Sequence, residues 1–242
     1  MNRSLSAVNW SAYARVYDLM AENNPAYQEI LSTCVATVKS WNLAAGSRLI
    51  DLGGGTGNFS VRLAQSLPHC KIVHVDRNPA MQAIAVKKAR RAGLRNHHVL
   101  LAEAERINFP LKSVAGIVSV HALNFVKVPK TMIQKLSGWL APKGHLFACD
   151  IGRHMNMTDW AVYLFREAWQ RHGLRKAMEL FWEGRAVAQQ NRQLSREYDQ
   201  GLFWIHNLAG YRNTFKRCGL AIDQSFLCYR GYSNAVVAHK LR

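Results

Sequence analysis

A glycine-rich turn next to an acidic residue is the first group of residues whose spacing suits ligand chemistry. The stretch Leu49–Gly57 places Asp51 ahead of glycines at alternate positions, Gly53, Gly55 and Gly57. An apolar stretch typical of a strand precedes the turn, and a helical stretch follows it. Glycine allows positive φ angles and close approach of the backbone to a ligand, and the following helix offers free N–H groups. The segment therefore predicts a ligand-binding turn.

Further polar residues follow later apolar stretches. Asp76 ends the next stretch, where a carboxylate can bind both hydroxyls of a ribose. Residues 102–105 read AEAE and lead into INFP at 107–110. Residues 140–144 read LAPKG and lead into a stretch that ends at Asp150. Because parallel strands end at one edge of a sheet, we expect these residues to meet there.

The elements that position these residues alternate between strand and helix from residue 47 to 150. The pattern predicts strands at 48–52, 72–76, 98–102, 116–120 and 144–150, and helices at 58–66, 80–92 and 130–140. A helix at 207–217 and a hairpin of 222–229 with 235–240 complete the pattern. The predicted fold class is α/β: a Rossmann-like, seven-stranded, mostly parallel sheet with helices on both faces.

Two flanking segments are predicted to be helical. Residues 10–41 read as two helices broken near residues 23–25, and residues 153–205 read as a helical insertion. The insertion is predicted to hold one helix at 158–172, with Thr158 as its N-cap, and a second at 175–197. We expect residues 1–242 to form a single domain, with a lid at 153–205 over the strand ends, where ligands of open α/β sheets bind.

These motifs together resemble class I S-adenosylmethionine-dependent methyltransferases, especially the branch that includes ubiquinone- and menaquinone-biosynthesis and related small-molecule enzymes. Their D-x-G-x-G-x-G motif is matched at 51–57, their GDAExLPF stretch is similar to 102–110, and their LKPGG turn is similar to 140–144. The resemblance covers about residues 10–150 and, more weakly, 207–240. It implies S-adenosyl-L-methionine as cofactor and S-adenosyl-L-homocysteine as product.

The resemblance also implies roles for individual residues. In the cofactor site these are the methionyl-binding glycines Gly53, Gly55 and Gly57, the amino-group ligand Asp51, the ribose ligand Asp76, the adenine neighbours Arg77, Glu103 and Ala104, and the closing aromatic Tyr17. Glu103 replaces the usual aspartate of the family. His121 stands where the methyl-transfer site is lined, and it is a candidate general base or a wall residue. The lid offers candidate substrate contacts that could equally be core residues: Tyr163, Trp182, Trp204 and His206.

Other chemistries fit the sequence less well. A dehydrogenase would carry G-x-G-x-x-G rather than glycines at alternate positions. Residues 120–123 read VHAL, not the Asn-Pro-Pro-aromatic motif of amino-methyltransferases that act on nucleic-acid bases or glutamine. The five cysteines are scattered and no acidic cluster accompanies Asp150, so we predict no metal site.

The chain is strongly basic, with 32 Lys and Arg against 15 Asp and Glu, a net charge of +17. This charge favours an anionic partner, and its densest cluster lies at residues 87–95. We expect a small-molecule acceptor that is aromatic or hydrophobic and can be anionic, as in secondary-metabolite or quinone-type biosynthesis. The alternatives are a lipid headgroup, an acid on a carrier protein docked at 87–95, an RNA, or a cofactor-binding module without transfer activity.

The location and assembly of the protein are less constrained by the sequence. No stretch has the form of a secretory signal, and the longest apolar run, 117–126, is too short to span a bilayer. We therefore expect a cytoplasmic protein without a transmembrane segment, for which peripheral membrane or carrier-protein contact stays open. Nucleic acid is not expected as a partner, and monomer and homodimer both stay open.

Overall fold

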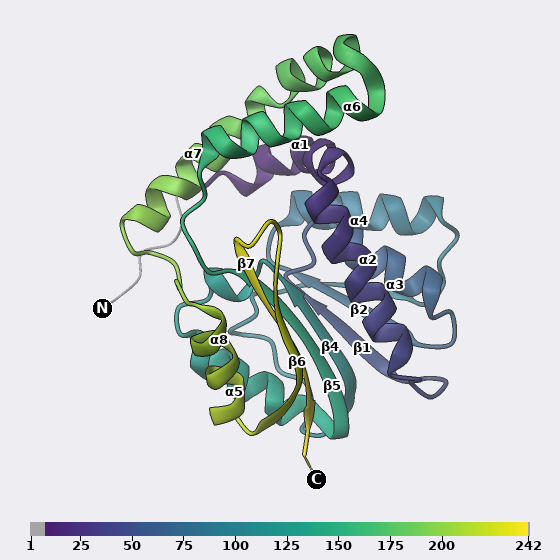
Figure 1. Cartoon of the computed structure of the whole chain (residues 1–242). Coiled ribbons are helices and arrows are strands. Elements are labelled where there is room, and N and C mark those ends of the chain that lie inside the picture. Colours follow the sequence, from purple (N-terminus) through teal and green to yellow (C-terminus); the bar gives the residue numbers. More distant parts are fainter. Residues whose placement is uncertain (1–7, 242) are drawn as a thin grey trace.

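A seven-stranded sheet forms the centre of the molecule in the computed structural model, which describes residues 8–241 (Figure 1). The strands are β1 (Arg48–Leu52), β2 (Lys71–Asp76), β3 (His97–Leu101), β4 (Val114–Val120), β5 (Leu140–Ile151), β6 (Leu220–Cys228) and β7 (Ser233–Lys240). Their order is β3-β2-β1-β4-β5-β7-β6. The first five strands in this order, β3 to β5, pair in parallel, whereas β7 is antiparallel to both β5 and β6. The predicted α/β fold class is confirmed.

Helices cover both faces of the sheet. They are α1 (Trp10–Asn23), α2 (Pro25–Ser40), α3 (Asn58–Ser66), α4 (Pro79–Arg91), α5 (Pro129–Trp139), α6 (Met157–Glu183), α7 (Arg185–Asp199) and α8 (Leu208–Arg217), with a short 3₁₀ helix at Leu123–Phe125. Figure 1 shows α2, α3 and α4 on one face and α5 and α8 on the other. Each face has its own core, one around Ile30 and Leu63 and one around Trp139 and Tyr211, all fully buried.

The predicted turn at residues 140–144 takes the form of a bulge at the start of β5. Leu140 pairs with Val114, but the next pair in the register joins His145 to Gly116. Lys143 has a positive φ of 63° inside this excursion. The regular parallel pairing of β5 with β4 therefore begins at His145 and continues toward Asp150.

Most of the helices have an asparagine as their N-cap residue. Five such asparagine side chains accept hydrogen bonds from the first turn of the helix that follows: Asn9, Asn24, Asn78, Asn156 and Asn207. The prediction that Thr158 caps α6 is wrong. The N-cap is Asn156, whose side chain accepts from the backbone N–H of Asp159 at 3.0 Å, so Thr158 already lies in the first helical turn.

Residues 157–199 form a helical hairpin. Gly173 has a positive φ of 81° inside α6 and reverses the chain there. Phe165 and Phe181 lie sixteen residues apart in sequence, yet their ring centroids are 6.0 Å apart across the bend. The predicted single helix at 175–197 is wrong because Gly184 separates the end of α6 from α7. We call residues 157–199 the helical hairpin.

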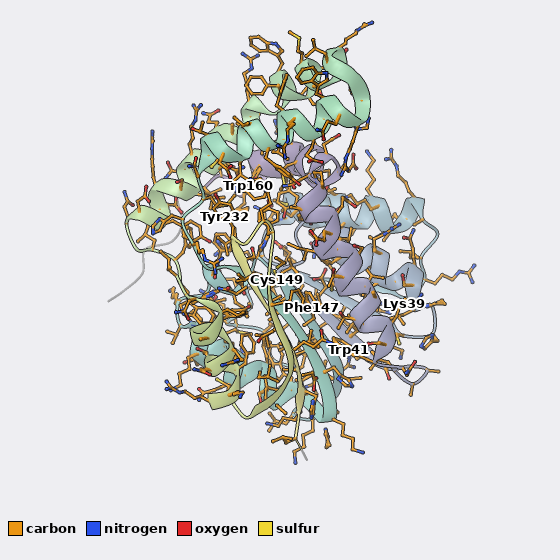
Figure 2. The ribbon with its side chains drawn as sticks, viewed as in Figure 1. Lys39, Trp41, Phe147, Cys149, Trp160 and Tyr232 are labelled. Carbon is orange, nitrogen blue, oxygen red and sulfur yellow. The ribbon has the colours of Figure 1, made fainter. Side chains whose placement is uncertain are left out.

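The base of the hairpin is fixed to the turn between β6 and β7. Arg230 donates to both carboxylate oxygens of Asp159, at 2.8 and 3.1 Å, and the Trp160 ring lies 4.6 Å from that of Tyr229. Figure 2 shows Trp160 and Tyr232 where the hairpin meets the sheet, and their ring centroids are 5.6 Å apart. The hairpin thus crosses the edge of the sheet at which the parallel strands end (Figure 1).

Candidate functional site

A cavity of about 200 Å³ lies at the carboxyl ends of β1, β2 and β4, between α1 and α7. Its lining includes these residues predicted from the sequence: Tyr17, Asp51, Gly53, Gly55, Asp76, Arg77, Ala104 and His121. Residues from the helical hairpin complete it: Asn191, Leu194, Ser195 and Tyr198. Eight of the predicted side chains and turn residues are therefore brought together in one place.

At two positions of the glycine turn, Gly53 and Gly57, both the backbone conformation and the close neighbours require glycine. Gly53 and Gly57 have φ angles of 70° and 82°. A Cβ on Gly53 would overlap the Cβ of Ala122, and one on Gly57 would lie 2.7 Å from the Cβ of Ala85. Gly53 faces the cavity, whereas Gly57 lies behind it as the N-cap of α3. The turn therefore brings bare backbone to the cavity wall.

Two carboxylates flank this turn. Asp51 is 2% exposed, and among the described residues its Oδ2 atom has no hydrogen-bond partner, although the Nδ1 atom of His74 lies 3.8 Å away. Asp76 accepts from the backbone N–H groups of Gly55, at 2.9 Å, and Asn78, at 2.7 Å. A buried carboxylate oxygen without a donor is costly, so Asp51 suits a cationic or N–H-bearing ligand group.

A polar network fixes the back of the turn. The ammonium group of Lys88 donates to Asp18 at 2.7 Å and to Asn58 at 2.5 Å. Thr56 also donates to Asp18, at 2.7 Å. Although Lys88 belongs to the basic cluster at 87–95, its side chain is bound within the fold. The network joins α1, α4 and the turn.

Aromatic rings form a part of the cavity wall beside the turn. They pack edge to face in the order Tyr13, Tyr17, Tyr27 and Phe59, with centroid distances of 5.4 to 6.3 Å. Burial raises the pKa of Tyr17 to about 12, so its hydroxyl stays protonated at neutral pH. Tyr13 and Tyr27 were missed from the sequence, although the 10, 13, 17 spacing of aromatics on α1 marks one helix face.

His121 lies in the cavity wall just after β4. Its Nε2 atom is 3.0 Å from the hydroxyl of Ser233, and its ring is 5.0 Å from that of Tyr229. The residue has a positive φ of 52°, an uncommon backbone conformation for a non-glycine residue. Burial lowers the pKa of His121 to about 4, so the ring is neutral at neutral pH.

A buried hydrogen-bond group connects the loop after β4 to the helical hairpin. Asn124 donates to the hydroxyl of Tyr198 at 2.9 Å and to the carbonyl of Ile151 at 2.7 Å. Asp150 accepts from the hydroxyl of Tyr211 at 2.8 Å, and burial raises its pKa to about 7. Asn124 and Tyr198 line the cavity and were not predicted. The signal for Asn124 is its place as a polar residue inside the apolar run at 117–126.

Glu103 is not part of the cavity lining. Its side chain is 42% exposed and forms an ion pair with Arg106 at 2.7 Å. The following residues, Ala104 and Glu105, face the cavity instead. The reason is local: the chain turns after β3, so neighbouring positions point to different sides.

The four aromatic residues predicted as substrate contacts also lie outside the cavity lining. Trp182 is 56% exposed on the outside of the hairpin. Tyr163 packs beneath the guanidinium of Arg230, whose Cζ is 4.1 Å from the ring centroid. Trp204 and His206 pack against Tyr211, at 5.3 and 4.2 Å between ring centroids. These side chains fill the interior or face away from the cavity. On the hairpin, aromatics lie on both sides of the helices, and the sequence alone does not say which side turns inward. Trp204 and His206 follow the hairpin and pack in the core instead.

Neither a metal-binding cluster nor a membrane-spanning helix is found among the residues that the structure describes. Residues 8–241 contain no group of three or more His, Cys, Asp or Glu side chains placed to hold a metal ion. Within the same residues, each helix falls short of the length and apolar character that crossing a membrane requires.

Comparison with known proteins shows what the core of the chain is similar to. Residues 49–144 match the family model described as a methyltransferase domain. A malonyl-[acyl-carrier protein] O-methyltransferase from Paenibacillus sp. is 26% identical over 174 residues, 69% of this chain and 63% of that protein. A demethylmenaquinone methyltransferase from Clavibacter sepedonicus is 29% identical over 140 residues, 58% and 54% of the two chains. A carboxy-S-adenosyl-L-methionine synthase from Nautilia profundicola is 26% identical over 46% of this chain. The chain covers less than two thirds of the length of each of these relatives.

Solved structures extend the likeness to almost the whole chain. Magnesium protoporphyrin IX methyltransferase from Synechocystis, with bound S-adenosylhomocysteine, superposes with a TM-score of 0.66 at 15% identity, over 97% of this chain and 95% of that one. A methyltransferase from Aquifex aeolicus gives a TM-score of 0.60 at 15% identity, over 93% and 98%. At this identity the likeness concerns the fold. The chain has the α/β fold of these methyltransferases, residues 49–144 match a methyltransferase domain, and the resemblance inferred from the sequence is confirmed.

Proposed function

We propose that this protein transfers the methyl group of S-adenosylmethionine to a small-molecule acceptor with an aromatic or hydrophobic body. One observation carries the proposal: the carboxylates of Asp51 and Asp76 beside the glycine turn and a set of aromatic rings line the same cavity. The carboxylates suit a polar nucleoside with an amino acid chain, and the rings suit an apolar acceptor.

The residues of the turn fit the cofactor. Asp51 has a buried carboxylate oxygen without a hydrogen-bond donor, which would bind the cofactor's amino group. Asp76 would bind the ribose hydroxyls, and the backbone of Gly53 and Gly55 would lie against the methionyl part. The backbone N–H of Ala104 would bind the adenine, with Arg77 beside the ring and Tyr17 closing over the cofactor. When bound, the cofactor supplies a methyl group that its sulfonium already activates.

The chain's own contribution to transfer is then mainly positioning. Holding a nucleophile in line can supply about 7–11 kcal/mol of the barrier. The rings of Tyr13, Tyr17, Tyr27 and Phe59 exclude water from that position, and the buried tyrosine hydroxyls remain neutral hydrogen-bond donors.

A base is needed only where the acceptor arrives protonated. Neutral His121 could then take the proton at Nδ1 while its Nε2–H group donates to Ser233. If the acceptor needs no base, His121 acts only as a polar part of the wall.

A carrier-bound acid is the second candidate acceptor. The specific observation is the exposed basic patch on and after α4, formed by Lys87, Arg90, Arg91 and Arg95. Such a patch matches the acidic surface of a carrier protein. Under this alternative, replacing Arg90 and Arg91 by Gln raises the KM for the carrier-bound substrate and leaves transfer to a free small molecule unchanged.

The test combines binding and transfer. Titration calorimetry should show that the full chain binds S-adenosylmethionine and S-adenosylhomocysteine, and Asp51→Asn should weaken both. The matched control is Asp223→Asn, since Asp223 is an exposed residue of β6 bound to His239. Labelled cofactor should then pass its methyl group to a member of a panel of phenols, quinols, amines and carboxylic acids. Binding without transfer to any acceptor class, including carrier-bound acids and RNA, would reduce the protein to a cofactor-binding module.

A further inference from the structure

The bend of the helical hairpin carries an unusual concentration of exposed apolar side chains. Among residues 8–241, thirteen large hydrophobic side chains are exposed, and six of them lie within the short stretch 162–182. We call the five that lie nearest the bend at Gly173 the apolar tip: Trp169, Leu174, Met178, Phe181 and Trp182. They are between 49 and 56% exposed, and they include every exposed tryptophan and phenylalanine of that set. Scattered exposed apolar residues are ordinary, but five large ones around one bend mark an interaction surface.

The apolar tip is separate from the faces that bind the hairpin to the rest of the protein. The outgoing leg buries Trp160 and Ala168, and the returning leg buries Ala177. Leu174, Met178 and Phe181 follow the i, i+4, i+7 spacing of one helical face, and that face is the exposed one. Phe165 lies between the legs, 6.4 Å from Trp169 and 6.0 Å from Phe181, and it holds the exposed rings in fixed positions.

Basic groups surround these rings. The guanidinium of Arg185 lies over the ring of Trp182, 4.1 Å from its centroid, and Arg175 at the bend is 95% exposed. Residues 162–185 contain five basic side chains, Arg166, Arg171, Arg175, Lys176 and Arg185, against three acidic ones, Glu167, Glu179 and Glu183. Arg171, Arg175 and Lys176 form ion pairs with Glu167 or Glu179, and the stretch keeps a net charge of +2, on a chain whose net charge is +17.

We infer that the apolar tip docks into the headgroup layer of an anionic lipid bilayer. Tryptophan suits this layer because its ring is apolar and its indole N–H is polar. Arg and Lys beside the rings bind anionic headgroups, while the aliphatic and aromatic side chains enter the boundary with the acyl chains. Figure 1 shows the bend of α6 at the outer edge of the molecule, beyond α1 and α4, where a planar surface can reach it.

The charge favours a bilayer over a second copy of the chain. Two copies brought together at this face would each carry a net charge of +17, which opposes association at low ionic strength. An anionic surface attracts the same face. A protruding tip also inserts into a fluid layer without the complementary groove that a protein partner would have to provide.

Docking would place the cavity near the bilayer. The returning leg continues through Gly184 into α7, which carries Asn191, Leu194, Ser195 and Tyr198 to the cavity wall. If the proposed methyl transfer holds, an amphiphilic acceptor could enter from the membrane side. The docking itself does not depend on that reaction.

The test is flotation of the full-length protein with two kinds of vesicle, phosphatidylcholine alone and phosphatidylcholine mixed with phosphatidylglycerol. We expect binding to the mixed vesicles, a blue shift of tryptophan emission on binding, and a loss of binding as salt is raised. The double variant Phe181→Gln and Trp182→Gln should lower the partition coefficient at least about tenfold. The matched control is Leu111→Gln with Leu227→Gln, which removes two exposed leucines elsewhere and should bind like the parent. Unchanged titration of S-adenosylhomocysteine into the first variant would show that its fold is intact.

Several results would overturn the inference. These are no binding to the mixed vesicles, equal binding to both kinds of vesicle, or full binding by the variant at Phe181 and Trp182. A concentration-dependent dimer in sedimentation that this variant abolishes would assign the apolar tip to a second copy instead. None of these outcomes depends on methyl transfer being observed.

Discussion

The glycine turn and the helical hairpin line the same cavity, but different kinds of contact hold them in place. The turn is held by its own backbone N–H groups as well as by the side-chain network behind it: the N–H groups of Gly53 and Gly54 donate to the carbonyl of Val75, and that of Gly55 donates to the carboxylate of Asp76. The hairpin is fixed by side chains, such as the pair of Asp159 with Arg230. Backbone geometry leaves little freedom for sequence change, whereas side-chain contacts can be replaced one by one.

The two sides of the cavity also have different proposed roles. Under the proposed function, the turn side binds the cofactor through Asp51 and Asp76, and the hairpin side faces the acceptor. We therefore expect substitutions in the turn to have large effects on cofactor binding, and substitutions in the hairpin to have small effects there and larger ones on the acceptor.

The largest effect is expected from Gly53→Ala. The added Cβ would overlap Ala122, and the φ of 70° strains any residue other than glycine. Overpacking typically costs about 1–3 kcal/mol, and we expect calorimetry to find cofactor binding weakened by about a hundredfold or more. Gly46→Ala is the matched control: its φ is 78°, but nothing lies within 4 Å of the new Cβ. Equal losses in the two variants would show that backbone strain alone, without the close packing of the turn, limits binding.

His121 lies where the two sides of the cavity meet, and it should make stability depend on pH. Burial lowers its folded-state pKa from 6.5 to about 4. As the pH falls below about 6.5 the unfolded chain takes up the proton first, so the free energy of unfolding decreases until about pH 4, where the folded ring is also protonated. His121→Asn should remove about 2–3 kcal/mol of this decrease. Urea denaturation at several pH values measures it, with exposed His172→Asn as the control, and an unchanged slope in the His121 variant would contradict the burial argument.

Asp76→Ala tests the cofactor side without adding bulk. The loss of a charge-assisted hydrogen bond, about 1.5 kcal/mol or more, should weaken binding of S-adenosylmethionine at least tenfold. The variant should still unfold cooperatively, and Asp223→Ala on the edge strand should bind like the parent. If affinity in the folded variant stayed the same, Asp76 would not be a ribose ligand.

The smallest effect is expected from Tyr198→Phe on the hairpin. Removing the hydroxyl that accepts from Asn124 should cost about 1 kcal/mol of stability. For a chain of this size that lowers Tm by about 2–4 °C. Cofactor affinity should hardly change, while the KM for the acceptor should rise. Tyr163→Phe at the base of the hairpin, outside the cavity lining, is the control, and a loss of cofactor affinity in Tyr198→Phe would remove the distinction between the two sides.

The turn side was largely predictable because it is local in sequence. The strand at 48–52 and the helix at 58–66 agree with β1 and α3, and the acids at 51 and 76 end neighbouring parallel strands. In the loop after β3 the sequence was a weaker guide: Ala104 lines the cavity as expected, whereas the side chain of Glu103 lies outside the lining.

The sequence predicted that the hairpin is helical, but it did not show which of its side chains are exposed. Trp160 and Trp169 lie on the same leg, yet one is buried and the other is exposed, because the neighbours that bury Trp160 come from the turn between β6 and β7. The bend at Gly173 depends on a single positive φ, which helical periodicity does not indicate. Because tertiary packing decides which tryptophan is buried, periodicity in one segment could not show which aromatics face the cavity.

The ammonium group of Lys88 couples segments that lie far apart in the sequence. It joins Asp18 of α1 to Asn58 at the start of α3, and Asn58 in turn donates to the hydroxyl of Tyr27 in α2. The ordering of the turn and the docking of the N-terminal helices are thus linked equilibria. A molecule that orders the turn must slow amide hydrogen exchange along α1 and α2. By reciprocity, a change that loosens α1, such as Asp18→Asn, must weaken whatever the turn holds.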